Sequence, residues 1–203
     1  MDNFNSVNSF FYNLEQIAKL KTTRIGIAGA GGIGSNCAHV LVRCGLVNFV
    51  LADFDQVSIS NLNRQNYTPN DLGKNKVDCL KNFLLRINPE LNITTHVCKI
   101  EKNNVHTIYG DCDIVVEAFD NPDYKSMIVE EFIGTEKFLV AVSGIGGYGN
   151  SDRIVTRKIR SNFYLIGDGL SEVGESVKPY APTVMIAAAK QADCILNHVL
   201  SLP

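Results

Sequence analysis

The sequence lacks the features that usually mark a metal-stapled, nucleic-acid-binding or membrane protein. No Cys-x-x-Cys pair is present, which excludes the usual spacing of a structural zinc site, so we expect no zinc. The 19 basic and 21 acidic residues give a net charge of −2, without a run of like charge. A nucleic-acid partner therefore has little support. No stretch approaches ~18 uninterrupted apolar residues, so we expect no membrane span.

The amino terminus also lacks a targeting pattern. Residues 1–6 have neither the basic start nor the apolar core of a secretion signal, which predicts a cytoplasmic protein. Six cysteines are scattered along the chain, most of them in apolar segments. We expect most of them to be buried, reduced and inert. With 203 residues, 45% of them hydrophobic, the chain can form one large core, which predicts a single domain over residues 1–203.

Short apolar runs alternate with segments of helical periodicity, and this alternation predicts an α/β fold. We expect an open, doubly wound, mostly parallel Rossmann-like sheet with right-handed crossovers. The predicted buried strands are residues 24–28, 49–52, 91–97, 113–118 and 138–142. The predicted helices between them are residues 33–44, 73–88, 101–109 and 122–134.

The two ends of the chain depart from this alternation. Residues 153–159 alternate apolar and polar side chains, which predicts an exposed strand in a C-terminal antiparallel extension. The glycine-rich, polar residues 167–180 are expected to be mobile, and a last helix is expected from Ala181. Phe11, Leu14 and Ala18 indicate an amphipathic helix before the first strand.

A glycine run directly follows the first predicted strand. Gly29, Gly31, Gly32 and Gly34 would let a backbone approach phosphates closely at a helix N-terminus. A tight strand–helix turn without a ligand is the alternative. Asp53 ends the second strand, where a carboxylate can accept hydrogen bonds from both ribose hydroxyls. These features predict a nucleotide site, and a dinucleotide dehydrogenase would share them.

Cationic and amide side chains after the second strand favour a triphosphate. Asn61, Arg64 and Lys76 add donors that a dinucleotide pyrophosphate does not need, and such donors suit the greater charge of a triphosphate. Asp120 follows another strand end and is a candidate magnesium ligand. The combination predicts adenylation by Mg-ATP.

The ordered motifs resemble those of the ubiquitin-activating-enzyme superfamily. Within it, the chain is most similar to the ThiF and MoeB adenylyltransferases of sulfur-carrier proteins, and above all to the short, zinc-free second ThiF family. The motifs that carry the resemblance are the glycine run at 29–34, Asp-Phe-Asp at 53–55, Ser-Asn-Leu-Asn-Arg-Gln at 60–65, Gly-Lys-Asn-Lys at 73–76, Ile-Asn-Pro at 87–89 and Phe-Asp-Asn at 119–121.

The resemblance implies an acyl adenylation that uses ATP and Mg²⁺. The substrate would be the C-terminal glycine carboxylate of a ubiquitin-like, ThiS-like sulfur carrier, pyrophosphate would be released, and the pathway would be thiamine thiazole synthesis. It also implies that Asp53 holds the ribose, that Asn61, Arg64 and Lys76 hold the phosphates, and that Asp120 binds magnesium. Arg64, Lys76 and Asp120 would be the catalytic residues, and the protein would be a homodimer.

The sequence departs from the family pattern in three ways. It has no zinc-binding cysteine pairs. Residues 160–181 contain no cysteine, which indicates a reaction that stops at the adenylate. No arginine precedes Arg24, although relatives lend an early arginine to the γ-phosphate across the dimer. Lys19 or Lys21 could replace it, or both could lie on a solvated helix face. Residues 146–149 either guide the carrier's tail or form a plain turn.

Other functions remain as alternatives. A superfamily member could adenylate a molybdopterin carrier, a peptide C-terminus or a tRNA base instead. An NAD-dependent oxidoreductase would need a proton donor near the strand ends, and none is evident. A non-catalytic subunit would have no need for Asp53, Asn61, Arg64, Lys76 and Asp120 together.

Overall fold

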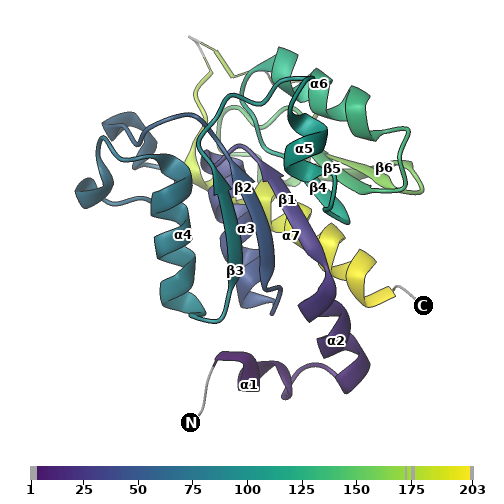
Figure 1. Ribbon diagram of the computed structural model, residues 1–203. Helices are drawn as coiled ribbons and strands as arrows, with labels where there is room; N and C mark the ends of the chain where they lie inside the picture. Colours follow the sequence, from purple (N-terminus) through teal and green to yellow (C-terminus); the bar gives the residue numbers. More distant parts are fainter. Residues whose placement is uncertain (1–3, 172, 175–176, 202–203) are drawn as a thin grey trace.

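The computed structural model of the protein describes residues 4–171, 173–174 and 177–201 and contains one seven-stranded sheet (Figure 1). The strand order is β3-β2-β1-β4-β5-β7-β6. Every neighbouring pair is parallel except β6 and β7, which are antiparallel. The predicted doubly wound, mostly parallel fold with a C-terminal antiparallel extension is therefore confirmed. The strands are β1 Arg24–Ala28, β2 Asn48–Ala52, β3 Asn92–His96, β4 Ile114–Glu117, β5 Phe138–Val142, β6 Val155–Arg160 and β7 Phe163–Gly167.

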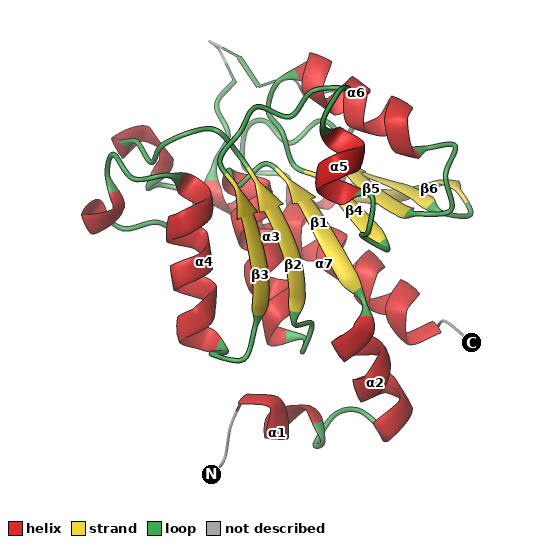
Figure 2. Cartoon of the chain, viewed as in Figure 1, coloured by secondary structure: helices red, strands yellow, loops and turns green. Residues whose placement is uncertain are grey.

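Helices cover both faces of the sheet (Figure 2). The core on one face is formed with α3, α4 and α7, whereas α5 and α6 pack on the other face. Both faces of the central strands are consequently buried, which is why β5 is apolar throughout and β4 is apolar except for its last residue, Glu117. The helices are α1 Phe4–Asn8, α2 Leu14–Thr22, α3 Gly32–Arg43, α4 Lys76–Ile87, α5 Val105–Tyr109, α6 Pro122–Phe132 and α7 Ala181–Ser201, with 3₁₀ turns η1 Ile59–Asn61, η2 Pro69–Asp71 and η3 Ser151–Arg153.

The parallel arrangement brings several loops to one edge of the sheet. The arrowheads of β1, β2 and β3 lie at the same end in Figure 2, and β4, β5 and β7 run parallel to them. The strand order reverses between β1 and β4. In folds of this kind, ligands bind beyond the carboxyl ends of the strands, at such a reversal.

The structure corrects several sequence-based boundaries. The helix expected over residues 101–109 begins only at Val105. The strand expected at 153–159 covers residues 155–160, and its partner β7 was not predicted. A run of four apolar residues between Asn162 and Gly167 is too short to distinguish a strand from a loop by periodicity. The short helix α1 was also missed.

The segment expected to be mobile, residues 167–180, is hydrogen-bonded to the loop after β5 near both of its ends. The amide of Gly147 donates to the carbonyl of Lys178 at 2.9 Å, and the amide of Asp168 donates to Gly144 at 2.9 Å. The mobility of the segment stays a prediction. Its residues 172 and 175–176 lie outside the described part of the chain.

The cysteines are free thiols, as expected. Four are buried and two are half-buried. Burial raises the pKa of all six thiols, so the reactive thiolate is scarce at neutral pH.

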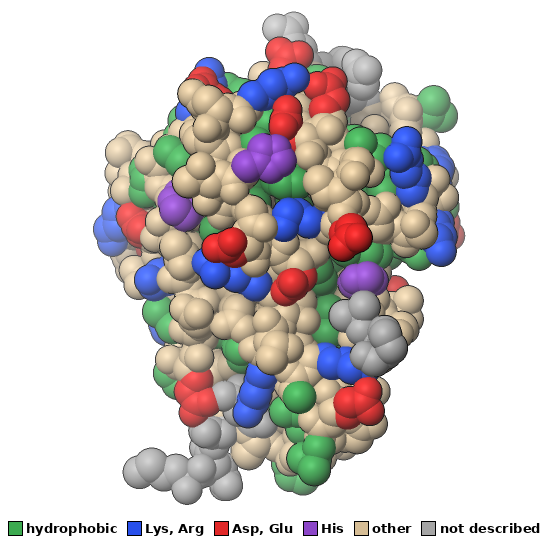
Figure 3. Space-filling model, turned by 45° about the vertical axis from the view of Figure 1, so that its right-hand side comes forward, with side chains coloured by type: hydrophobic (Ala, Val, Ile, Leu, Met, Phe, Trp, Pro, Cys, Tyr) green, Lys and Arg blue, Asp and Glu red, His purple; other side chains and the backbone are tan. Residues whose placement is uncertain are grey.

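Two surface properties bear on possible partners. None of the helices in the described ranges is long and apolar enough to cross a membrane. On the face drawn in Figure 3, lysine and arginine side chains are interspersed with acidic ones. A single-sign patch of the kind that attracts a polyanion is not visible on that face.

Candidate functional site

The glycine run forms the tight turn between β1 and α3. Gly29 has a φ of +100°, a left-handed conformation that suits glycine. A Cβ atom on Gly34 would lie 1.9 Å from the carbonyl oxygen of Gly29. The first turn of α3 therefore lies too close to the glycine turn to accommodate a side chain at position 34. The N-terminus of α3, with Gly31 as its N-cap, thus points its amides and positive dipole end at the carboxyl edge of the sheet.

Asp53 links the end of β2 to this turn. Its Oδ2 accepts a hydrogen bond from the amide of Ala30 at 2.7 Å, and its Oδ1 accepts one from Asp55 at 2.8 Å. The side chain is buried. Burial raises the pKa of Asp53, and these two amides and the charge of Lys76 oppose the rise. Because each carboxylate oxygen has a second lone pair, Asp53 can still accept hydrogen bonds from ribose hydroxyls.

Lys76 is the first residue of α4 and lies close enough to Asp53 to influence its charge. Its ammonium is 2.6 Å from Oδ2 of Asp55, and only 7% of the lysine side chain is exposed. The amide of Lys76 also donates to the carbonyl of Asp55 at 3.0 Å. Asp55 thus holds the predicted phosphate-binding cation in place. The sequence places Asp55 in the Asp-Phe-Asp motif but gives no sign of this role.

Asn61 lies at the end of η1 and is 9% exposed. Its Oδ1 accepts a hydrogen bond from the amide of Ser58 at 2.9 Å, which closes the 3₁₀ turn. Within the described residues its Nδ2 has no hydrogen-bond partner, so this donor is available to an anion.

Arg64 lies over the glycine turn. Its aliphatic carbons would be 3.5 and 3.7 Å from a Cβ atom on Gly32. Nη1 donates to the carbonyl of Ser60 and to Oδ1 of Asn63, both at 2.8 Å. Burial lowers the pKa of Arg64, and the negative charge of Asp120 opposes this effect. The guanidinium is therefore positioned between the glycine turn and the loop after β4.

Further polar contacts fix the Arg64 loop to the carboxyl edge of the sheet. Asn36 of α3 donates to the carbonyl of Arg64 at 2.9 Å. The buried hydroxyl of Tyr67 donates to the carbonyl of Ala30 at 2.6 Å and to that of Lys76 at 3.3 Å. One tyrosine thus bridges the glycine turn and the start of α4. Sequence reasoning did not identify Tyr67, and only its position within two residues of the Asn-Arg-Gln motif could have suggested it.

Asp120 is exposed in the loop after β4. The described residues contain no group of three histidine, cysteine or acidic side chains that could hold a metal ion. Magnesium commonly needs only one or two carboxylates when substrate phosphates and water complete its coordination. The residues therefore fit a magnesium ion held by Asp120 and the phosphates of a bound nucleotide, and they do not form a closed protein cage.

A buried ion pair behind Asp120 was not predicted from the sequence. Glu117, the last residue of β4, is fully buried and lies 3.1 Å from the ammonium of Lys125 in α6. Its carboxylate also accepts hydrogen bonds from the amides of Phe119 and Val142, at 2.7 and 3.3 Å. Burial raises the pKa of Glu117, whereas Lys125 lowers it. The pair connects the Asp120 loop to the end of β5.

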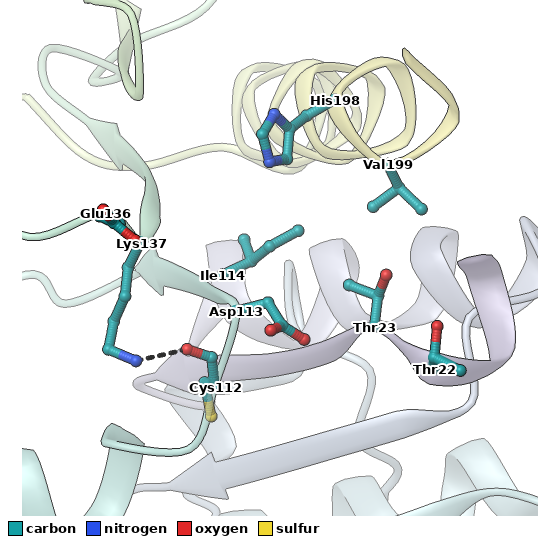
Figure 4. Close-up of a pocket in the computed structure, with 9 residues that line it drawn as sticks. All are labelled: Thr22, Thr23, Cys112, Asp113, Ile114, Glu136, Lys137, His198 and Val199. Atoms are coloured by element: carbon teal, nitrogen blue, oxygen red, sulfur yellow. Dashed lines mark hydrogen bonds between the residues drawn. The ribbon is translucent and has the colours of Figure 1, made fainter. Parts of the chain in front are cut away.

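A cavity of about 510 Å³ lies elsewhere (Figure 4). Its lining includes Thr22, Asp113, Lys137 and His198. These residues flank the amino ends of β1, β4 and β5 or belong to the last turns of α7, so the cavity lies at the opposite edge from Asp53. Lys137 donates to backbone carbonyls there, including that of Cys112 at 2.6 Å. The predicted nucleotide-binding residues do not line this cavity.

Comparison with curated proteins finds partial-length relatives. Adenylyltransferase and sulfurtransferase UBA4 of Candida glabrata is 33% identical over 132 residues, which cover 64% of this chain and 30% of that protein. Ubiquitin-like modifier-activating enzyme 5 of Drosophila persimilis is 36% identical over 122 residues, 54% of this chain and 32% of that protein. The chain thus spans about a third of the length of these relatives.

Solved structures share the fold, and a family profile covers almost the whole chain. Escherichia coli tRNA N6-threonylcarbamoyladenosine dehydratase TcdA, in complex with AMP, has a TM-score of 0.87 at 18% identity, covering 97% of this chain and 93% of that one. E. coli MccB with ATP has a TM-score of 0.75 at 23% identity, covering 98% and 64%. The ThiF family profile matches residues 5–200. By this match, the chain belongs to the ThiF family.

Proposed function

We propose that this chain, as one domain over residues 1–203, adenylylates the C-terminal glycine carboxylate of a ubiquitin-like sulfur carrier. ATP is the co-substrate, Mg²⁺ the cofactor, and the product is a carrier-adenylate with release of pyrophosphate. The observation that carries the proposal is that Asp53 and Arg64 both lie against the glycine turn at the α3 N-terminus. Lys76 lies close to Asp53, and the carbonyl of Asn61 accepts a hydrogen bond from the amide of Arg64. A carboxylate, an amide and two cations at that edge match a ribose and a triphosphate.

The reaction requires positioning and charge stabilisation. The carrier carboxylate is already ionised at neutral pH, so it attacks the α-phosphorus without a general base. The new bond joins carboxylate oxygen to α-phosphorus, and the bond to the bridging oxygen of pyrophosphate breaks. Arg64 and Lys76 stabilise the charge that develops on the phosphates. Magnesium, held by Asp120, would neutralise phosphate charge and keep the pyrophosphate aligned as a leaving group.

The finer assignments are part of the same proposal. We assign a ThiS-like carrier in thiamine thiazole synthesis, a homodimer, a cytoplasmic location and no structural zinc. Residues 146–149, after β5, would guide the carrier's C-terminal tail towards the nucleotide. The names of the relatives support a substrate of this general class, since UBA4 and enzyme 5 are named for adenylyl transfer and for activation of a ubiquitin-like modifier.

Carrier-dependent exchange of labelled pyrophosphate into ATP tests the proposal. The wild-type protein is assayed with a ubiquitin-like carrier from its own genome and, in parallel, with a peptide and with tRNA. Asp120→Ala and Arg64→Ala should each lower the exchange rate by about a hundredfold. Arg160→Met is the matched control, because Arg160 is exposed on β6 at the far edge of the sheet. Exchange that depends only on the peptide or tRNA would refute the carrier assignment.

A further inference from the structure

Two loops at the carboxyl edge of the sheet are tied together by polar contacts outside the nucleotide-binding residues. They are the β5 loop, residues 143–153, and the β7 loop, residues 167–171. The amides of Asp168 and Gly169 donate to the carbonyls of Gly144 and Ser143, at 2.9 and 3.0 Å. Because β5 and β7 are neighbouring parallel strands, both loops leave the sheet at the edge that carries Asp120.

Asp168 is the centre of the contact. Its carboxylate accepts hydrogen bonds from the amides of Leu170 and Ser171, each at 2.8 Å, and from the Ser171 hydroxyl at 2.7 Å. It also forms an ion pair with Arg153. A Cβ atom on Gly144 would lie 2.0 Å from Oδ1 of Asp168. The β5 loop therefore lies directly against this carboxylate.

Arg153 links Asp168 to the middle of the β5 loop. One guanidinium nitrogen contacts Asp168, the other donates to the carbonyl of Gly146, and Nε donates to Asn150 at 3.0 Å. The Thr183 hydroxyl of α7 lies within hydrogen-bond distance of the carbonyls of Gly147 and Tyr180, at 3.1 and 3.0 Å. The glycine-rich segment is thus fixed at successive carbonyls, although glycine alone would leave it free to adopt many conformations.

The fixed segment presents unused backbone donors. In the described part of the chain, the amides of Ile145 and Gly146 have no hydrogen-bond partner. Gly146 is a buried residue, and Ile145 is half-buried. Buried amides without a partner are rare in folded proteins, since each costs the free energy of a lost hydrogen bond. An extended peptide backbone would supply the missing carbonyls. The aromatic pair of Tyr148 and Tyr180, with ring centroids 4.9 Å apart, lies beside the segment.

We propose that Arg153 and Asp168 are positioning residues that hold the Ile145 and Gly146 amides in place to bind the backbone of the acyl substrate's C-terminal tail. This role rests on the proposed adenylylation and concerns the acyl substrate only. Neither residue contacts Asp53, Asn61, Arg64 or Lys76 through any of the hydrogen bonds and ion pairs of the described residues. The pair should therefore control binding of the carrier without affecting binding of ATP.

The test separates carrier binding from nucleotide binding. Arg153→Met removes both guanidinium contacts, and Asp168→Asn keeps the shape of the side chain while removing its charge. Arg160→Met is the control. Pyrophosphate exchange is measured against the concentration of the ubiquitin-like carrier, and ATP binding is measured by calorimetry, which also reports whether each variant is folded. Hydrogen–deuterium exchange over residues 144–149 is recorded on each free protein and with carrier.

The expected result is a split between the two substrates. Each positioning variant should raise the KM for the carrier by about tenfold, the factor expected when neutral amide–carbonyl hydrogen bonds to the tail are lost. The exchange rate at saturating carrier and the Kd for ATP should stay within about twofold. Residues 144–149 should exchange faster in both variants, and carrier should slow exchange at Ile145 and Gly146 in the wild-type protein.

Three results would overturn the proposal, and they are distinguishable. An unchanged carrier KM in both variants, with full wild-type activity, would refute the positioning role alone. Equal losses of carrier and ATP binding would show that the pair only supports the fold. If the wild-type protein binds ATP but catalyses no exchange with the carrier, the proposed function itself fails, and with it the role of the pair.

Discussion

Replacing Gly34 with alanine tests how closely α3 must approach the end of β1. The added Cβ atom would lie 1.9 Å from the Gly29 carbonyl oxygen, about 1.5 Å inside an ordinary van der Waals contact. Neither atom belongs to a flexible side chain, so the backbone must move. Alanine gains about 1 kcal/mol over glycine from helix propensity, whereas forcing an overpacked site apart costs about 3 kcal/mol or more. The steric term therefore dominates.

The net loss can be measured as stability and as nucleotide affinity. About 2 kcal/mol corresponds to a decrease in Tm of about 4 to 8 °C for a chain of this size. A shift of the glycine turn also moves the amides at the α3 N-terminus, which should weaken ATP binding by about tenfold or more. Differential scanning calorimetry and titration calorimetry with Mg-ATP give the two quantities.

The matched control is Gly134→Ala, since a Cβ atom there would meet nothing within 4 Å. Its free energy of unfolding should change by less than about 0.5 kcal/mol, and its ATP affinity should not change. If Gly34→Ala is as stable as this control and binds Mg-ATP as tightly, the tight turn is not required and the reasoning fails.

Three further substitutions test the polar contacts of the same edge. Asp55→Asn should release Lys76 from its ion pair. Because Asp55 is half exposed, the free energy of unfolding should fall by only about 1 kcal/mol, while the rate of carrier-dependent exchange falls about tenfold. An unchanged exchange rate would contradict the anchoring role. Glu117→Gln leaves Lys125 without its buried partner. The free energy of unfolding, measured in urea, should fall by about 3 kcal/mol, and an unchanged value would refute the importance of the pair. Burial raises the pKa of Asp168, but hydrogen bonds from Ser171 and Leu170 and the charge of Arg153 lower it to about 2. Because its ordinary value is 3.8, Asp168 stabilises the fold fully above about pH 4. The stability difference of about 2 kcal/mol between wild type and Asp168→Asn should therefore disappear as the pH falls from about 4 to 2, and a difference that persists at pH 2 would refute the assignment.

The site residues that directly follow a strand could be predicted from the sequence. Gly29, Asp53 and Asp120 each follow a buried apolar run, and the carboxyl ends of parallel strands necessarily meet at one edge. The alternation of buried runs with helical segments sufficed to predict the five parallel strands β1 to β5 and the helices between them. Convergence of these residues therefore followed from local patterns alone.

The contacts that fix the site could not be predicted in this way. Asp55 and Lys76 are 21 residues apart, and Arg153 and Asp168 are 15 apart. Their pairing is set by how two loops meet in space, and the sequence shows only that charged residues are available. The same limit explains the missed strand β7. Its own apolar run is short, and its strand conformation depends on pairing with the neighbouring strand β5.

Lys76 and Arg64 keep free N–H donors in addition to their contacts within the protein. Lys76 already contacts Asp55, and Arg64 already donates through Nη1 to Ser60 and Asn63. An ammonium has further N–H groups, and a guanidinium has a second Nη and an Nε, so phosphate oxygens would add contacts without breaking these. Asp55 lowers the net positive charge that a nucleotide meets, and this weakens ground-state attraction. In the proposed reaction, both cations would be oriented before the substrate arrives, so little reorganisation would be needed when charge develops on the phosphates.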